Sequence, residues 1–209
     1  MNAFAEFSTK VPQVLLTHVF PAYLLGSIPF GYLFGRLKGI DIRKHGSGNI
    51  GATNVWRVLG RNWGLLTFAL DFLKAILAVW LVKLCAEHVY VLLAVVFAVL
   101  GHNFPVWLRF KGGKGVATSA GGLCIWMPYV FLTVVGVWIV TFYTTRYVAL
   151  ASMGAAATLP LAAWYFYPHH PFWMGMSVFL GAMTIWTHRT NIQRLMNGTE
   201  HRFVKNSKS

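Results

Sequence analysis

Charged side chains are scarce in this sequence of 209 residues. Lys, Arg, Asp and Glu together make up 11% of it, well below the ~25% of an ordinary soluble domain. Hydrophobic residues make up 56%, and the mean hydropathy is +0.56. This composition excludes an ordinary water-soluble domain and predicts an integral membrane protein.

Acidic residues and cysteines are also rare. Five residues are Asp or Glu and two are Cys. Cys85 and Cys124 lie in separate apolar stretches without the spacing of a zinc site or a disulfide framework, so we interpret both as packing residues. We expect no metal and no cofactor. With so few carboxylates, a carboxylate–histidine pair for general-base catalysis is poorly supported.

Positive charge is in excess, with 18 Lys and Arg residues and a net charge of +13. Such an excess can indicate a protein that binds nucleic acid. In a membrane protein, however, basic residues gather in cytoplasmic loops and near anionic lipid headgroups. We therefore expect membrane lipids, and not nucleic acid, as the partners of these charges.

Long apolar runs account for most of the chain. They span residues 12–37, 63–84, 89–108, 115–143, 147–167 and 171–187. Most are close to the ~20 residues that a helix needs to cross a bilayer, and the alternating pattern of barrel strands is absent. The runs predict an all-α integral membrane protein. Pro21, Gly26, Pro29 and Gly31 predict a first helix that is kinked and packs closely.

Basic residues are unevenly shared between the connections. They concentrate in residues 36–62, in the turn at 109–114 and in the tail after 187, whereas the turns at 83–88 and 168–170 together hold one Lys and no Arg. By the positive-inside rule the three basic segments share the cytoplasmic side. We therefore predict a cytoplasmic C-terminus and an N-terminus on the outer side.

Two segments that lie on the same side of a membrane must be joined by an even number of crossings. Residues 115 and 187 both lie near the inner side, so an even number of crossings joins them, yet only three apolar runs are present. Pro128 disfavours a continuous helix in the longest run, and a break at Met127–Pro128 gives four crossings, the first short or re-entrant. The prediction is a bundle of about seven transmembrane helices, in a single domain over residues 1–209.

Three polar segments share the predicted cytoplasmic side. They are HGSGNIGATNVWRVLG at 45–60, GHNFPVWLRFKGGKGVAT at 101–118 and THRTNIQRLMNGTEHRF at 187–203. Together they supply glycine amides, several cations, and hydroxyl and amide side chains. Such a mixture suits an anion that carries phosphate.

The second polar segment contains a glycine-rich turn followed by a helix. Gly112, Gly113 and Gly115 have no Cβ, so their N–H groups can approach a ligand closely, and Lys111 and Lys114 add positive charge. A helix starting near Gly115 would point its positive end at a bound phosphate. The turn is not a Walker loop, because Gly follows Lys114 where Ser or Thr is required. The alternative is a flexible basic turn that only satisfies the positive-inside rule.

The first polar segment places one cation among small polar groups. Ser47, Asn49, Thr53 and Asn54 can bond hydroxyl groups or phosphate oxygens, and Arg57 follows Asn54 by three residues, about one helical turn. The alternative for each residue is turn and capping chemistry, to which Ser, Asn and Gly are suited.

The third polar segment offers His188 and Asn191, three positions apart and hence on one helix face. His188 can accept a proton or bond a hydroxyl group. The alternative is an interfacial histidine that caps a helix end. Glu200 can pair with either Arg194 or Arg202.

Ionisable groups also lie inside the apolar runs. Asp71 and Lys74 are three positions apart, and charges at that depth are costly unless they pair or line a polar cavity. We expect a structural ion pair, with substrate contact as the alternative. We expect His102 near the interface, bonded to a neighbouring helix.

The three polar segments resemble the cytoplasmic motifs of the bacterial acyl-phosphate:glycerol-3-phosphate acyltransferase family. YLLGSIPFG at 23–31 and LDFLKA at 70–75 are similar to that family too, so the resemblance covers nearly the whole chain. It implies transfer of a fatty acyl group from acyl-phosphate to the 1-hydroxyl of glycerol-3-phosphate. The products would be lysophosphatidic acid and phosphate, in the first acylation of bacterial phospholipid synthesis. It further implies the bacterial cytoplasmic membrane, an active site on the cytoplasmic side, and a soluble or peripheral partner enzyme that makes acyl-phosphate.

The resemblance also implies roles for the polar residues. Those expected at glycerol-3-phosphate are Ser47, Asn49, Thr53, Asn54, Arg57, Lys114, His188 and Asn191. Those expected at acyl-phosphate are Lys111, Gly112, Gly113 and Gly115. Within the first set, Ser47, Arg57 and Lys114 would meet the phosphate, and His188 and Asn191 the hydroxyl groups. No residue is expected as general base, because the phosphate of the acyl donor would take the proton.

Two other functions fit parts of the pattern. A phosphate-ester transporter would suit an intramembrane ion pair and broken helices, but no half of the chain is repeated and the polar segments crowd one side. An acyl-CoA-dependent acyltransferase has against it only the absence of a His-x4-Asp dyad.

Overall fold

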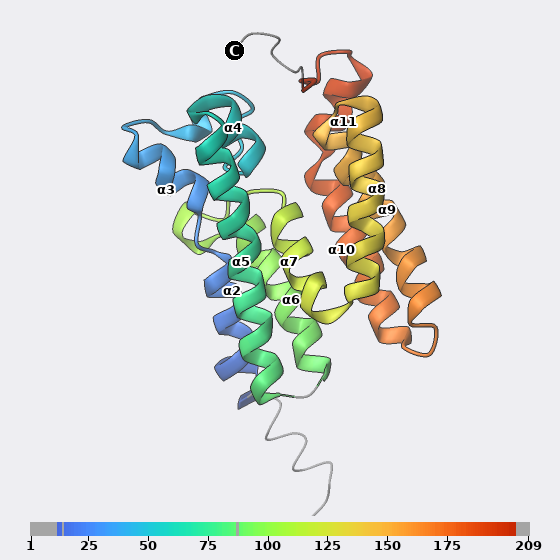
Figure 1. Ribbon diagram of the computed structural model, residues 1–209. Coiled ribbons are helices and arrows are strands. Elements are labelled where there is room, and N and C mark those ends of the chain that lie inside the picture. The colour runs from blue at the N-terminus through green and yellow to red at the C-terminus, as the bar shows by residue number, and fades with distance from the viewer. Residues whose placement is uncertain (1–11, 14, 87, 204–209) are drawn as a thin grey trace, which may run out of the picture. The chain divides into compact units, whose positions relative to one another are not determined.

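The described part of the chain is helical throughout. A computed structural model describes residues 12–13, 15–86 and 88–203, and these residues contain helices, turns and loops but no strand (Figure 1). The chain divides into two compact units, Met1–Trp126 and Met127–Ser209, here called unit 1 and unit 2. The expectation of a single domain over residues 1–209 stays a prediction.

Unit 1 contains the first two polar segments. Its helices are the π-helix η1 (Leu15–Val19), α2 (Phe20–Gly26), α3 (Phe30–Leu37), the short 3-10 helix η2 (Ile42–Lys44), α4 (Ala52–Leu59), α5 (Arg61–Cys85), α6 (His88–Asn103), the short 3-10 helix η3 (Val106–Leu108) and α7 (Val116–Trp126). The long helix α5 contacts α2, α4, α6 and α7. In Figure 1, α4 lies at the end of unit 1 where α5 begins.

Unit 2 contains the third polar segment. Its helices are α8 (Pro128–Thr145), α9 (Val148–Phe166), α10 (Pro171–Thr187) and α11 (Arg189–Met196). Helix α9 packs against both α8 and α10. A Cβ added at Gly181 of α10 would lie 2.7 Å from the carbonyl oxygen of Ala156 in α9, so this glycine lets the two helices approach closely.

Several helices have the length and composition of membrane spans. Among the described residues, Arg61–Cys85, Tyr90–Leu108, Pro128–Thr145 and Val148–Phe166 are long and apolar enough to cross a membrane. Leu15–Gly26 and Val116–Trp126 are apolar but shorter. The predicted all-α, membrane-type fold is confirmed, while the number of crossings and the side of each terminus stay predictions.

The break expected in the longest apolar run is confirmed. Helix α7 ends at Trp126 and α8 begins at Pro128, with Met127 between them in a non-helical conformation. Proline is favourable at the first position of a helix because its missing N–H would have no partner there. Helix α7 has 11 residues, which agrees with the short or re-entrant first piece.

The first apolar run is interrupted, and not only kinked as predicted. Helix α2 ends at Gly26, and α3 begins at Phe30 after the non-helical Pro29. Proline disfavours helix in the residue before it, which accounts for the break. Close packing is present as predicted: a Cβ added at Gly26 would meet the backbone of Ala98 in α6, and one at Gly31 would meet the Ile50 carbonyl.

Candidate functional site

A small hydrophobic cluster joins the first two polar segments at one end of unit 1. Ile42, Ile50, Val55 and Leu108 are buried together. The first three residues come from η2, the loop after it and α4, whereas Leu108 comes from η3. Packing of apolar side chains therefore positions the polar groups of both segments.

Asn54 organises the loop between η2 and α4. Its side chain is 1% exposed. The amide nitrogen Nδ2 donates to the carbonyl oxygens of Ile42, His45 and Asn49 at 3.3, 3.1 and 2.8 Å, and Oδ1 accepts from the Ser47 N–H at 2.8 Å. Both ends of the amide are thus used inside the loop. Asn54 holds the shape of the predicted binding segment by these bonds.

The remaining polar residues of this segment lie around α4. Asn49 Oδ1 accepts from the Gly51 N–H at 2.8 Å, just before the helix begins. Thr53 is half-buried and Arg57 is exposed. Because they are four residues apart in α4, Thr53 and Arg57 lie on one face of the helix. The turn and capping alternative therefore describes Asn49 and Asn54, while Arg57 lies exposed on α4.

The glycine-rich turn packs against the end of α6. The N–H groups of Gly112 and Gly113 donate to the carbonyl oxygens of Asn103 and His102, each at 3.0 Å. A Cβ added at Gly112 would meet the His102 carbonyl, and one at Gly113 would meet the His102 ring. The lack of a side chain at these two glycines serves close packing within the protein. Their N–H groups are not directed to a ligand as the sequence suggested.

The start of α7 has the features of an anion site. Gly115 precedes the helix with a φ of +79°, a left-handed conformation that favours glycine. The first N–H groups of a helix have no intrahelical acceptor and carry partial positive charge. Helix α7 begins at Val116, so the predicted helix start near Gly115 is confirmed. Lys114 adjoins this end of the helix.

Three polar side chains at the start of α7 have no hydrogen-bond partner among the described residues. They are the Asn103 amide and the Thr118 and Ser119 hydroxyl groups. Asn103 is 4% exposed and Thr118 is fully buried, and a Cβ added at Gly115 would lie 2.6 Å from Asn103 Oδ1. Such groups are costly unless a ligand or water bonds them. The sequence does not reveal these three groups, because burial without a partner has no sequence signal.

The predicted ion pair inside α5 is present and is part of a larger network. Lys74 Nζ lies 2.7 Å from Asp71 Oδ1 and donates to the Ile28 carbonyl oxygen at 2.8 Å. It also lies 3.1 Å from His102 Nδ1 of α6. The same His102 nitrogen lies 3.4 Å from Asp71 Oδ1, so the three side chains meet at one point. The network joins α5, α6 and the chain after α2, and the His102 ring supports Gly113. The Asp71–Lys74 ion pair and the bond from His102 to a neighbouring helix are confirmed, while their structural role and the place of His102 near the interface stay predictions.

His188 lies at the junction of α10 and α11 in unit 2. It is 3% exposed, and its Nδ1 lies 2.8 Å from the Thr184 carbonyl oxygen. A carbonyl can only accept, so Nδ1 carries the proton and Nε2 is the accepting nitrogen of the neutral ring. The local bond therefore sets the tautomer of this candidate residue.

Asn191 and Arg194 on α11 share one acidic partner. Asn191 Nδ2 and Arg194 Nε donate to the two carboxylate oxygens of Glu200, each at 2.9 Å. Glu200 thus pairs with Arg194, whereas Arg202 Nε donates to the Thr145 carbonyl at 3.3 Å. The bond to Glu200 orients the Asn191 amide, which is 5% exposed.

The chain after α11 folds back onto the end of α8. The Phe203 N–H donates to the Arg146 carbonyl oxygen at 2.8 Å, and the Phe203 ring meets the Phe142 ring edge to face. The third polar segment and the basic residue Arg146 thus lie at the same end of unit 2, as the positive-inside rule favours. Among the described residues, no cluster of His, Cys, Asp and Glu could hold a metal ion.

A family model described as glycerol-3-phosphate acyltransferase matches residues 16–198. The chain belongs to the glycerol-3-phosphate acyltransferase family. The matched region includes all residues of both candidate sets and ends just before Glu200.

Individual members of the family are similar along most of their length. The glycerol-3-phosphate acyltransferase of Bacillus subtilis is 46% identical, covering 86% of this chain and 92% of its own. That of Aquifex aeolicus is 47% identical, covering 87% of this chain and 95% of its own.

Two crystal structures of PlsY (YgiH), an integral membrane glycerol 3-phosphate acyltransferase, have the same fold. The glycerol 3-phosphate form has a TM-score of 0.84 and the lysophosphatidic acid form one of 0.80. Both are 44% identical in sequence and cover 90% of this chain and 95% of their own.

Proposed function

We propose that this protein transfers a fatty acyl group from acyl-phosphate to the 1-hydroxyl of glycerol-3-phosphate, forming lysophosphatidic acid and inorganic phosphate. The reaction is the first acylation of phospholipid synthesis. It takes place in the bacterial cytoplasmic membrane at a site that faces the cytoplasm. A separate soluble or peripheral enzyme supplies the acyl-phosphate. Family membership supports acyl transfer over the phosphate-ester transporter, and the ligands of the two PlsY forms match the acceptor and the product.

The observation that carries the proposal is the start of α7. There, buried Thr118 and Asn103 side chains have no partner among the described residues, beside Lys114 and the positive end of a helix. A buried polar group without a partner costs about 1–3 kcal/mol. A phosphate oxygen can accept from the Thr118 hydroxyl, from Asn103 Nδ2 and from the first N–H groups of α7. This arrangement suits the headgroup of acyl-phosphate.

The expected ligands divide between direct contact and support. Arg57, Lys111 and Lys114 supply positive charge for the two phosphates, and Ser47 and Thr53 supply hydroxyl groups. Asn49 and Asn54 hold the loop in which these groups lie. Likewise Gly112 and Gly113 hold the turn that brings Gly115 and the start of α7 to the donor.

The reaction needs little covalent chemistry from the protein. The 1-hydroxyl oxygen attacks the acyl carbonyl carbon, and the bond from that carbon to the bridging phosphate oxygen breaks. The hydroxyl proton passes to a phosphate oxygen of the donor, whose second pKa is about 6 by analogy with phosphorylated side chains. Because acyl-phosphate is a mixed anhydride with a good leaving group, positioning and charge stabilisation are the tasks left to the protein.

His188 and Asn191 position the acceptor. With Nδ1–H donated to Thr184, His188 Nε2 accepts a hydrogen bond from a glycerol hydroxyl. With its amide nitrogen donating to Glu200, Asn191 presents its carbonyl oxygen as a second acceptor. Neither residue has to remove a proton in this scheme.

A comparison of donors tests the proposal. Purified protein in detergent receives labelled glycerol-3-phosphate with acyl-phosphate, acyl-CoA or acylated acyl carrier protein in separate reactions. We expect labelled lysophosphatidic acid and stoichiometric phosphate with acyl-phosphate alone. Equal product from acyl-CoA would contradict the assigned donor. Absence of product with every donor, together with counterflow of glycerol-3-phosphate in liposomes, would favour the transporter.

A further inference from the structure

A cavity of about 480 Å³ opens at the surface of unit 1, between α3 and the turn after α6. Its lining residues are Tyr32, Arg43, Trp107, Leu108, Arg109 and Lys111. Only Lys111 belongs to the residues expected to bind acyl-phosphate. The cavity therefore calls for an explanation beyond acyl transfer.

The cavity carries positive charge that the protein does not neutralise. Arg43 donates to both carboxylate oxygens of Asp41, at 2.9 and 2.7 Å, and this contact holds the pKa of the Asp41 carboxyl well below its ordinary value. Asp41 thus stays ionised and balances Arg43. The side chains of Arg109 and Lys111 form no hydrogen bond or ion pair within the described residues. Arg109, which the proposed reaction does not use, remains to attract an anion.

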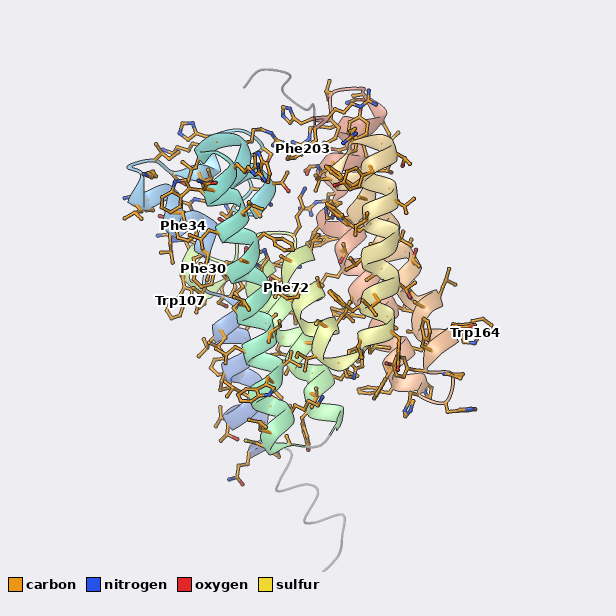
Figure 2. The ribbon with its side chains drawn as sticks, in the orientation of Figure 1. Phe30, Phe34, Phe72, Trp107, Trp164 and Phe203 are labelled. Carbon is orange, nitrogen blue, oxygen red and sulfur yellow. The ribbon has the colours of Figure 1, made fainter. Side chains whose placement is uncertain are left out.

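Exposed apolar side chains come from the same two segments as the cavity lining. Trp107 is 62% exposed and Phe110 is 60% exposed, and Figure 2 shows Trp107 directed away from the helices of unit 1. On α3, Leu33 and Leu37 are also exposed. The candidate membrane span Tyr90–Leu108 ends within the cavity lining. Cations and an exposed tryptophan at the end of a span are typical of the headgroup level of a bilayer.

The backbone at this cavity is held in an uncommon conformation. Arg109 and Phe110 have φ values of +52° and +61°, in the left-handed region that non-glycine residues rarely adopt. Hydrogen bonds from the Phe110 and Lys111 N–H groups to the carbonyl oxygens of Pro105 and Leu108 fix the turn. The turn directs consecutive residues of opposite character, Arg109 and Phe110, to the surface.

We propose that this cavity binds the headgroup of an anionic phospholipid. The lipid phosphate lies at the Arg109 guanidinium, which the proposed reaction does not use. The acyl chains run along the exposed apolar side chains of α3 and of the turn. A free phosphate ion or an acidic protein surface would use the cations but leave the surrounding apolar side chains uncovered. An anionic lipid uses both.

Native mass spectrometry of the purified full chain, titrated with single lipids, tests the proposal. The probes are phosphatidylglycerol and phosphatidylcholine with identical acyl chains, so that only the headgroup differs; both carry a phosphate, and the choline cation cancels its charge. We expect the first phosphatidylglycerol to bind about tenfold more tightly than phosphatidylcholine, as one charge-assisted contact allows. Equal affinities for the two lipids would overturn the proposal.

Variants locate the site. Arg109→Asn removes the charge and keeps the left-handed backbone, which Asn tolerates better than most residues. This variant should lose the preference for phosphatidylglycerol. Arg109→Lys should retain it. The matched control is Arg36→Gln, an exposed arginine of α3 that does not line the cavity, and it should change the preference less than twofold.

Two outcomes would contradict the site. One is an equal loss of preference in Arg109→Asn and Arg36→Gln, which would indicate non-specific attraction to net charge. The other is displacement of phosphatidylglycerol by millimolar inorganic phosphate, which would indicate a free-phosphate site. The assay measures no acyl transfer, so its result is independent of the proposed reaction.

Discussion

Two asparagines of unit 1, Asn54 in α4 and Asn103 at the end of α6, are buried almost equally and bonded very differently. Asn54 is 1% exposed, and its amide makes four hydrogen bonds to the backbone of its own loop. Asn103 is 4% exposed, and its amide makes none among the described residues.

The difference separates two kinds of polar residue in the candidate site. A buried amide with all partners present stabilises the fold and needs no ligand. A buried amide without partners lowers the stability of the fold, and a ligand that bonds it can offset this loss of free energy. Asn54 therefore represents residues that shape the site, and we propose that Asn103, with Thr118, represents residues that meet the substrate.

The largest effect on stability is expected from Asn54→Leu. The substitution is close to isosteric but leaves one buried N–H and three carbonyl groups without the amide, so we expect a loss of about 3 kcal/mol or more in the free energy of unfolding. Thermal unfolding in detergent measures it. Asn49→Ala, which removes one hydrogen bond in the same loop, should lose only about 1 kcal/mol. Equal melting temperatures for Asn54→Leu and the unsubstituted protein would show that Asn54 does not hold the loop.

The next largest effect is expected from Arg57→Ala, which removes a cation proposed to bind the phosphate of glycerol-3-phosphate. A charge-assisted bond to phosphate contributes about 1.5–3 kcal/mol, so the KM for glycerol-3-phosphate should rise about tenfold or more. The control is Arg61→Ala, which removes an arginine stacked over Trp56 at the start of α5. A KM equal to that of the control would remove Arg57 from the site.

A smaller effect is expected from His188→Gln. Glutamine can bond a hydroxyl but cannot act as an imidazole base. Loss of one positioning hydrogen bond costs about 0.5–1.5 kcal/mol, so kcat should fall roughly 2- to 13-fold. Loss of a general base costs about 10²–10⁴-fold. A fall beyond about a hundredfold, with loss of the acidic limb of the pH–rate profile, would make His188 the proton acceptor.

The sequence predicted those features of the fold that depend on local chemistry. Apolar length located the long helices, and Pro128 located the break between α7 and α8, because proline cannot continue a helix from its N-terminal side. The cost of charge inside a membrane predicted the Asp71–Lys74 pair. At Pro29 the sequence indicated only a kink, whereas the helix is interrupted. Sequence alone does not show whether the backbone groups exposed by a break find other hydrogen-bond partners.

The candidate site was less predictable, because its residues depend on contacts distant in sequence. The sequence indicated Gly113 as a residue that lets a ligand approach, but the nearest group is the His102 ring, supported in turn by Lys74. Thr118 lies in the second polar segment without any feature that distinguishes it from an ordinary helix residue. Only the fold shows that its hydroxyl is buried without a partner.

The most direct test of the distinction compares two fully buried threonines, Thr118 and Thr67. The Thr67 hydroxyl donates to the Trp63 carbonyl at 2.8 Å, whereas the Thr118 hydroxyl has no partner among the described residues. We predict that Thr118→Val keeps or raises the melting temperature while the KM for acyl-phosphate rises roughly 2- to 13-fold. Thr67→Val should lose about 1 kcal/mol of stability at an unchanged KM. A lower melting temperature with an unchanged KM for Thr118→Val would contradict the assignment of the start of α7 to the acyl donor.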